Sequence, residues 1–261
     1  MSKAFVEGTF DDIKSLDLRF LEEAAKSGPL TVLLRSDEAI LAETGKAPRF
    51  PFAERQYFLA ATRFVADVVE CPSTGAALLA WNDGIWVERE GGSRQSYCRE
   101  HGIAHRLVTA ADLSGFPEPQ PKPVQGPKVV VTGCYDWFHS GHVRFFEEAS
   151  AFGALYVVVG HDRNIRALKG EGHPLLPEAE RRYVVGAIKH VTQALISTGE
   201  GWLDADPQIK QIKPDYYVVN EDGDKGGKRE YCESNGIQYK VLRREPAPGL
   251  PKRSSTDLRG F

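Results

Sequence analysis

Short apolar runs rich in β-branched and aromatic residues recur through the second half of the chain, and segments with helical spacing lie between them. We expect strands at 128–133, 155–160, 194–198, 216–220 and 239–243. We expect helices near 141–152, 177–189, 203–212 and 226–235. Because strands that alternate with crossover helices pair in parallel, this pattern predicts an α/β fold with a parallel sheet. Ligands of such sheets bind at the carboxyl ends of the strands.

A proline-rich segment separates the two halves of the chain. Residues 113–127 (LSGFPEPQPKPVQGP) hold five prolines and two glycines, which disfavour both a continuing helix and a central strand. We therefore interpret 113–127 as a linker between a domain at 1–112 and a domain at 128–261.

The two halves also resemble each other. A displacement of 125 positions places residues 6–24 on residues 131–149, and nine of these nineteen positions are identical. The same displacement aligns Gly28 with Gly153, and YCREHGI near the end of the first half matches YCESNGI in the second. The sequence thus predicts two tandem domains related by internal duplication.

The composition excludes several classes of protein. With 41% hydrophobic and 26% charged residues, the 261-residue chain matches an ordinary globular protein. A net charge of −3 argues against general binding of nucleic acid or of membrane surfaces, so any anion site must be local. The four cysteines form no C-x-x-C pair, and the chain begins without a long apolar stretch. We expect a cytoplasmic protein without an integral membrane segment.

The segment HSGH at 139–142 carries the clearest chemistry. It follows a predicted strand and opens a predicted helix, where backbone N–H groups and the helix dipole favour phosphate. Two imidazoles at this spacing can face one anion, and Gly141 leaves room for a phosphate to approach the backbone.

Four motifs in order give the chain a family resemblance: GCYDWFHSGH, KG at 169–170, ER at 180–181 and RSSTDL at 253–258. Together they resemble the cytidylyltransferase family, most closely its tandem-domain ethanolamine-phosphate enzymes. The resemblance implies two Rossmann-like nucleotidylyltransferase domains, of which 128–261 is catalytic. It also implies Mg²⁺-dependent transfer of CMP from CTP to a small phosphorylated alcohol, with release of pyrophosphate. Phosphoethanolamine is the first expected acceptor, and glycerol 3-phosphate is the second.

The resemblance further implies roles for individual residues. His139, His142 and Lys169 would be catalytic and hold the phosphates. Nucleotide contacts would come from Gly133, Cys134, Tyr135, Asp136, Phe138, Gly141, Arg181, Arg253, Ser254, Ser255 and Thr256. Asp222 and Trp202 are candidates for the acceptor site, and no metal ligand is identified.

Several of these positions have a structural alternative. Arg55 and Asp11 persist in the first half at the positions of Arg181 and Asp136, which favours scaffold roles such as an ion pair or a loop contact. Trp202 would serve equally well as a packing residue.

The first half lacks the phosphate ligands. Lys14-Ser-Leu-Asp17 stands at the position of HSGH, so both imidazoles and the glycine are replaced. We infer a degenerate, inactive copy that packs against the active one as an intramolecular pseudodimer, and a further homodimer is left open.

Two alternatives to CTP-dependent transfer stay open, because HxGH does not select the base. One is an adenylyltransferase that uses ATP. The other is a nucleotide-binding regulatory protein without turnover.

Overall fold

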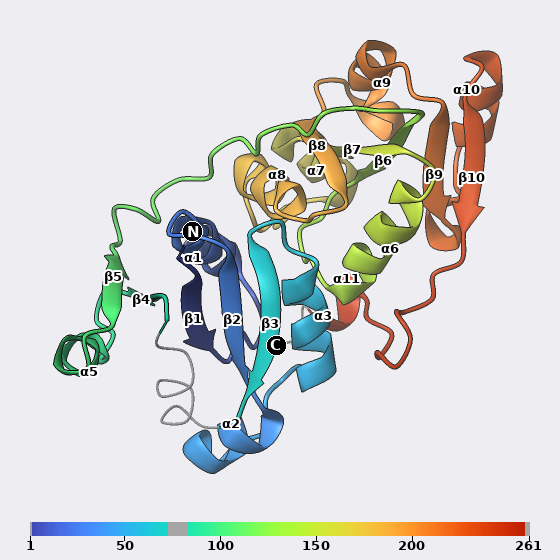
Figure 1. Cartoon of the computed structure of the whole chain (residues 1–261). Helices are drawn as coiled ribbons and strands as arrows, with labels where there is room; N and C mark the ends of the chain where they lie inside the picture. The colour runs from blue at the N-terminus through green and yellow to red at the C-terminus, as the bar shows by residue number, and fades with distance from the viewer. Residues whose placement is uncertain (1, 73–82, 259–261) are drawn as a thin grey trace. The chain divides into compact units, whose positions relative to one another are not determined.

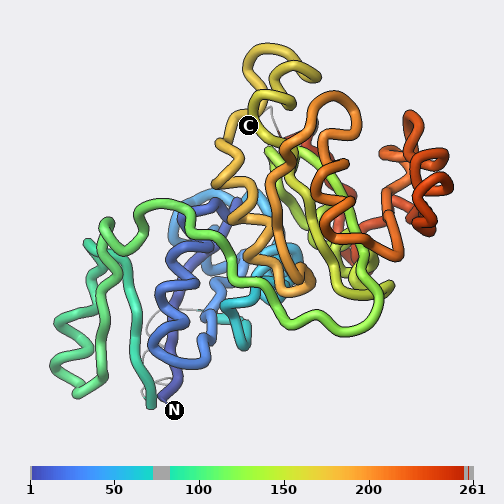
Figure 2. Tube along the Cα trace, turned by 90° about the horizontal axis from the view of Figure 1, so that it is seen from above, coloured from blue at the N-terminus to red at the C-terminus, as the bar shows by residue number. Residues whose placement is uncertain are grey.

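The computed structural model describes residues 2–72 and 83–258. Its contacts divide the chain into two compact units, Met1–Gly115 and Phe116–Phe261 (Figure 1). The trace in Figure 2 runs from blue to green through the first unit and from green to red through the second. Within the described residues, no helix combines the length and the apolar character needed to cross a membrane.

The second unit is built on a five-stranded sheet in which every strand pair is parallel, in the order β10-β9-β6-β7-β8. Its strands are β6 (Lys128–Gly133), β7 (Ala154–Val159), β8 (Val191–Ile196), β9 (Tyr216–Asn220) and β10 (Gln238–Leu242). Its α-helices are α6 (Ser140–Ser150), α7 (Asp162–Lys169), α8 (Glu178–Gly186), α9 (Asp206–Ile212), α10 (Lys228–Ser234) and α11 (Ser255–Leu258). Two short 3-10 turns are η1 (Gly201–Leu203) and η2 (Glu221–Gly223). The predicted α/β class with a parallel sheet is confirmed.

The first unit contains a second parallel five-stranded sheet, in the order β3-β2-β1-β4-β5. Its strands are β1 (Ala4–Gly8), β2 (Leu30–Arg35), β3 (Val65–Cys71), β4 (Ile85–Arg89) and β5 (Ala104–Val108). Its described helices are α1 (Ser15–Ala25), α2 (Asp37–Thr44), α3 (Phe52–Ala60) and α5 (Gln95–Glu100). When the strands are counted along each unit, the two sheets have the same order. Duplication as the origin of this likeness stays a prediction.

Most of the proline-rich segment packs on the second unit. The Phe116 ring lies 5.7 Å from the Tyr183 ring, and Glu118 forms an ion pair with Arg182 at 3.1 Å. Pro119 lies so close to Gly186 of α8 that a Cβ there would come within 2.2 Å of it. These contacts place the end of the first unit at Gly115, inside the segment that the sequence assigns to a linker.

Helix α7 was not among the helices expected from the sequence. Its residues DRNIRALK are mostly polar, and only Asn164 and Ile165 are buried, so the apolar spacing that marks a helix is absent. The helix begins instead with a cap, because the Nδ1 of His161 accepts a hydrogen bond from the backbone N–H of Asn164 at 3.2 Å. Lys169 of the KG pair at 169–170 is the last residue of this helix.

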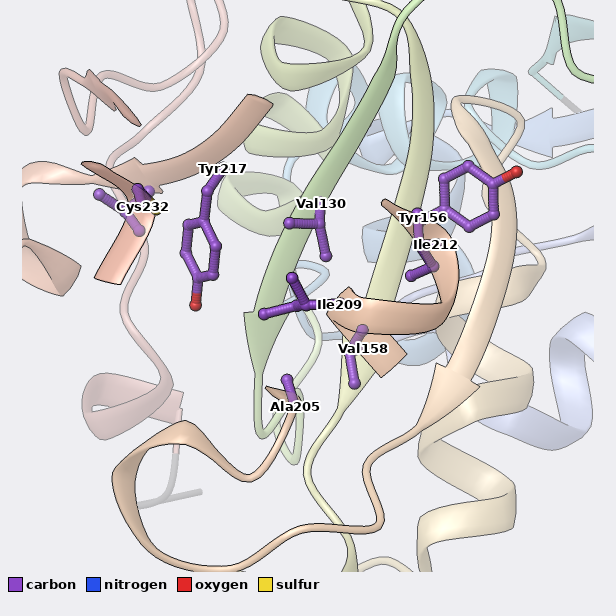
Figure 3. Packing of buried hydrophobic residues seen from close by; sticks show 9 residues of the cluster. Val130, Tyr156, Val158, Ala205, Ile209, Ile212, Tyr217 and Cys232 are labelled. Carbon is purple, nitrogen blue, oxygen red and sulfur yellow. The ribbon is translucent and has the colours of Figure 1, made fainter. Parts of the chain in front are cut away.

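Successive valines of β6 lie on opposite faces of the second sheet. Val130 belongs to an apolar cluster with residues of β7, β9, α9 and α10, and its two neighbours Val129 and Val131 are equally buried on the opposite face. Figure 3 shows this cluster, with Ile209 of α9 and Tyr217 of β9 lying near Val130. The packing of α9 and α10 therefore fixes the position of β9, which carries part of the site described below.

Shortening a side chain in this cluster should destabilise the second unit. Ile209 is 2% exposed, so Ile209→Ala removes buried apolar surface and leaves a cavity. We expect the free energy of unfolding to fall by about 2–5 kcal/mol, measured by urea denaturation. The matched change at the 39% exposed Val241, Val241→Ala, should cost no more than about 0.5 kcal/mol. Equal losses in the two variants would contradict this assignment of the core.

Candidate active site

A cavity of about 240 Å³ opens at the carboxyl ends of β6 and β9. The connection from β6 leads to β7 on one side, whereas β9 lies on the other side, so the cavity occupies the crevice where the strand order reverses. Its lining is formed by Thr132, Gly133, Cys134, Tyr135, Asp136, Trp137, His139, Gly141, His142, Phe145, Lys169, Val218, Val219, Asn220, Asp222, Gly223, Lys228, Arg244 and Ser255.

The turn after β6 sets the floor of this cavity. Tyr135 has a φ of +56°, and its ring lies over Gly133, where a Cβ would come within 2.8 Å of the ring. The ring also contacts His142 and Phe146 edge-on, with centroids 5.5 and 5.3 Å apart. Glycine at position 133 thus lets a buried aromatic ring brace the start of α6.

The two histidines of HSGH cap helix α6 with their ring nitrogens. The Nδ1 of His139 accepts a hydrogen bond from the backbone N–H of Gly141 at 3.1 Å. The Nδ1 of His142 accepts from the backbone N–H of His139 at 3.3 Å. The ring centroids lie 4.1 Å apart. Because Nδ1 is the acceptor in both neutral rings, Nε2 carries the proton in both and is the atom that can donate to a ligand.

The environment of His142 keeps its imidazole neutral. Burial lowers the pKa of His142 well below its ordinary value, and a proton on His139 or the charges of Arg244 and Lys169 lower it further by charge repulsion. A neutral His142 still donates through Nε2–H, so phosphate binding at this position does not depend on a histidinium.

Lysine and arginine side chains make the cavity rim basic. Lys169 reaches it from the end of α7, and Arg244 from the segment after β10. The Nζ of Lys228 donates to the carbonyl of Gly223 at 2.6 Å, and burial lowers the pKa of Lys228. Arg244 is held by an ion pair with Asp222. Anions entering the cavity therefore meet positive charge in a protein of negative net charge.

Arg181 lies outside the cavity lining and is fully buried. Its guanidinium donates to the carbonyls of Leu176, Cys134 and Gly160 at 2.9, 2.6 and 2.8 Å, and it pairs with Asp162 at 2.6 Å. The structure thus gives Arg181 a scaffold role, because four bonds to the protein hold its guanidinium away from the cavity.

Arg55 makes the same set of bonds in the first unit, to the carbonyls of Phe50, Thr9 and Arg35 and to the Asp37 carboxylate. This shared network explains why an arginine stands at this position in both halves of the chain.

Asp136 reaches the cavity but is also committed to a loop. Its carboxylate accepts hydrogen bonds from the backbone N–H groups of Leu175 and Leu176, each at 2.9 Å. Asp11 accepts in the same way from the backbone of Arg49 and Phe50. Asp136 therefore pins the loop that follows Lys169.

The C-terminal segment meets the start of α6. The Oγ of Ser255 donates to the carbonyl of Trp137 at 3.3 Å, and Ser255 lines the cavity. Arg253 lines a small adjoining recess with Gly141 and Arg244 rather than the cavity itself. Ser254 and Arg253 directly precede α11, and the side chain of Thr256 lies outside the described part of the structure.

The structure brings ten of the predicted site residues to one cavity. These are Gly133, Cys134, Tyr135, Asp136, His139, Gly141, His142, Lys169, Asp222 and Ser255. Phe138 lies beneath them and stacks on His142, with ring centroids 5.2 Å apart. Trp202 does not line the cavity; its ring lies beside Gly227 and is 54% exposed.

Sequence reasoning missed part of the cavity lining, including the residues of β9 and Arg244 after β10. The missed lining residues are Thr132, Trp137, Phe145, Val218, Val219, Asn220, Gly223, Lys228 and Arg244. The one available signal was position, since Asn220 ends a predicted strand and so lies at the edge of the sheet where ligands bind.

The equivalent crevice of the first unit is bridged by its own ion pairs. In both sheets the first strand pairs with the fourth in the same register, so Arg89 at the end of β4 occupies the position of Asn220. Arg89 pairs at 2.5 Å with Asp17, which stands where the second unit has His142. Arg and Asp thus meet across the crevice that holds the cavity in the second unit.

No group of three or more His, Cys, Asp or Glu side chains placed to hold a metal occurs among residues 2–72 and 83–258. The described side chains therefore do not fit a metal site formed by the protein alone, and the expected Mg²⁺ stays a prediction.

Comparison with known proteins assigns the family. Residues 130–261, just over half of the chain, match the model of the cytidylyltransferase-like family. The chain belongs to the cytidylyltransferase-like family. This membership confirms the nucleotidyltransferase class expected from the four motifs.

Two archaeal relatives of this family member are named FAD synthase. The protein of Ferroglobus placidus is 40% identical over 119 residues, which cover 44% of this chain and 74% of the relative. That of Methanospirillum hungatei JF-1 is 34% identical over 134 residues, covering 50% of this chain and 82% of the relative. The bifunctional protein HldE of Alcanivorax borkumensis is 32% identical over 160 residues, but these are 60% of this chain and 30% of that protein.

These relatives correct the expected reaction. Transfer from CTP to phosphoethanolamine or another small alcohol phosphate is contradicted, because the similar proteins are FAD synthases. The assignment to the ethanolamine-phosphate branch is wrong for the same reason. HxGH and a loop lysine report phosphate binding only, so they could not distinguish this branch from others in the family.

Protonation of His142 should couple stability to pH. Below about pH 6.5 the unfolded chain takes up a proton at this residue, whereas the folded chain, with its lowered pKa, does not. The free energy of unfolding should therefore fall as the pH drops below about 6.5. Urea denaturation at pH 7.5 and pH 5.5 should show a smaller difference for His142→Gln than for the unaltered protein. His190, whose pKa is also lowered by burial, contributes equally to both proteins. The same pH dependence in both would contradict the lowered pKa.

Proposed function

We propose that this chain transfers the AMP moiety of ATP to a phosphate monoester, with FMN as the first candidate acceptor, and releases pyrophosphate. The observation that carries the proposal is the 40% identity to an FAD synthase over 74% of that relative's length. The proposal takes up the ATP-dependent alternative that the sequence motifs left open.

The reaction is a single displacement at phosphorus. An oxygen of the acceptor phosphate forms a bond to the α-phosphorus of ATP, the bond from that phosphorus to the bridging α–β oxygen breaks, and pyrophosphate leaves with the electron pair. No covalent intermediate with the protein is required. Catalysis then depends on aligning two anions and on stabilising charge on the phosphoryl oxygens.

The cavity holds the groups that this reaction needs. The Nε2–H groups of His139 and His142 and the first backbone N–H groups of α6 would donate to the phosphates. Lys169 would supply positive charge from the rim, where Gly170 and Gly172 follow it with φ values of +89° and +82°. A lysine at a helix end followed by glycines can approach a bound phosphate as the loop adjusts.

Mg²⁺ is part of the proposal as a partner of the nucleotide. It binds substrate phosphates together with few protein ligands, so the lack of a carboxylate cage among the described side chains is compatible with such a cation. When bound, it would neutralise phosphate charge.

The flavin end of the acceptor needs apolar surface outside the phosphate pocket. Leu168 and Leu175 are 56% and 55% exposed and lie on either side of Lys169 along the chain. Trp202 is exposed to a similar degree beside Gly227. We propose these side chains as contacts for the ring system of the acceptor. Asp222 is less suited to that role, because it is paired with Arg244.

The first unit would then be a non-catalytic copy produced by duplication. The shared strand order and the matching networks of Arg55 and Arg181 support this part of the proposal. The Arg89–Asp17 pair spans the position of the active crevice, which disfavours nucleotide binding there. The pseudodimer arrangement stays a prediction.

Product analysis tests the reaction directly. The protein should be incubated with Mg²⁺, each of ATP, CTP, GTP and UTP, and each of FMN, phosphoethanolamine and glycerol 3-phosphate. We expect FAD and pyrophosphate from ATP with FMN. Product from CTP alone would overturn the proposal, and nucleotide binding without product from any acceptor would favour the regulatory alternative.

Removing one imidazole should abolish most of the activity. In His142→Ala the phosphates lose a preorganised donor, so we expect kcat to fall by about 10²-fold or more, measured as FAD formation. The exposed His101 of the first unit offers a matched control, because its ring stacks on Tyr97 away from any such motif. His101→Ala should retain the full rate. A His142→Ala enzyme of unchanged rate would show that the site is misplaced.

A further inference from the structure

The wall of the cavity opposite the histidines carries a polar group that the fold leaves unused. Asn220 is the last residue of β9 and lines the cavity. Its Oδ1 is buried, and in the described structure no group donates a hydrogen bond to it. A buried amide oxygen without a donor destabilises the free protein, so a ligand that supplies a donor gains by binding there.

The first unit shows which positions face each other across this crevice. There Arg89, at the position of Asn220, reaches Asp17, at the position of His142, at 2.5 Å. The second unit replaces this ion pair by a neutral amide and a neutral imidazole, and the space between them is cavity. A ligand that fills the crevice therefore spans from His142 to Asn220.

A basic residue near this crevice also has different partners in the two units. Lys228 stands three residues before Tyr231-Cys232 in the second unit, as Arg94 stands three residues before Tyr97-Cys98 in the first. Arg94 pairs with Glu7 at 2.7 Å and lies 4.0 Å from Glu88. The second unit has Thr132 and Val219 at the positions of those two acids. The Nζ of Lys228 donates to the carbonyl of Gly223 and keeps further N–H donors for a ligand.

The two walls suit different parts of a nucleotide. The wall at α6 offers imidazole and backbone N–H donors, which match phosphate oxygens. The wall at β9 offers the apolar Val218 and Val219 together with the amide of Asn220. A flat apolar base with a hydrogen-bonding edge fits this second wall, whereas a phosphate does not.

We propose that Asn220 reads the nucleobase of the bound nucleotide and selects an amino-purine over an oxo-purine. This inference rests on the proposed use of ATP. The Oδ1 of Asn220 accepts from the exocyclic amine of adenine, while its Nδ2 donates to an adjacent ring nitrogen. An asparagine matches adenine in this bidentate way. At the N6/N7 edge hypoxanthine presents an oxygen and a ring nitrogen, both of which are acceptors, so Oδ1 lacks a donor whichever way the amide is turned.

The test compares the binding of ATP and ITP without any acceptor. These nucleotides differ only at the 6-position of the base and the proton on the neighbouring nitrogen. Dissociation constants from titration calorimetry should favour ATP by about 10- to 100-fold in the unaltered protein. In Asn220→Leu the ratio should fall to near 1. Asn220→Ala, which also lacks the amide, should likewise give a ratio near 1.

Two controls separate base reading from general damage to the protein. Inorganic tripolyphosphate should bind all Asn220 variants as it binds the unaltered protein, which shows that the phosphate wall is intact. Asn235→Asp changes an exposed asparagine at the end of α10 and should leave the ATP-to-ITP ratio unchanged. If Asn220→Leu does not fold, the smaller Asn220→Ala carries the test.

The outcomes distinguish this inference from the proposed function. Equal ATP-to-ITP ratios in the unaltered protein and the Asn220 variants would overturn the inference, even if the protein makes FAD. A shifted ratio together with failure of FMN as acceptor would uphold the inference and overturn the proposed acceptor. Tighter binding of CTP than of ATP by the unaltered protein would overturn both.

Discussion

A single buried guanidinium joins the segments at the carboxyl ends of the strands in the second sheet. Arg181 bonds to the carbonyl of Cys134 after β6, to that of Gly160 after β7 and to that of Leu176 before α8, and it pairs with Asp162 at the start of α7. The turn after β6 and the end of α7 carry residues that line the cavity, and the arginine that joins these segments is fully buried. Loss of a hydrogen-bond partner in such a buried network costs about 1–3 kcal/mol. The positions of the histidine turn and of Lys169 depend on this one side chain.

The sequence was sufficient for the parts of the fold and site that are local. The strands 128–133 and 216–220 have the predicted bounds, because apolar runs mark them clearly. The HSGH turn could be assigned to phosphate from its own residues and its place after a strand. Arg181 and Asp136 were found, but their commitment to backbone partners depends on which loops meet, and only the folded chain determines that. For the same reason Arg244, 105 residues after His139 along the chain, could not be assigned to the site, and the only signal for Asn220 was its place at the end of a predicted strand.

The two units share one sheet framework, but the charges at the carboxyl ends of their strands are balanced differently. In the first unit Glu7 and Asp17 satisfy the arginines that reach toward them, so the crevice is neutralised from within. In the second unit the corresponding positions are Thr132 and His142, and the cations at the rim face a cavity. Positive charge that is not matched inside the protein raises the local concentration of anions and strengthens their binding at low ionic strength. The sheet alone therefore does not determine whether a unit binds a nucleotide.

The cap at the start of α6 has a consequence for how such a site can be lost. His142 accepts a hydrogen bond from the backbone N–H at the first position of the HSGH turn, and Asp17 accepts the equivalent bond from the backbone of Lys14 at 2.7 Å. Aspartate is a good acceptor at a helix start and is further favoured there by the helix dipole. An exchange of histidine for aspartate at this position would remove a phosphate donor and keep the helix cap. Selection for a stable fold would not oppose such an exchange, so a unit can lose this phosphate donor without losing the start of its helix.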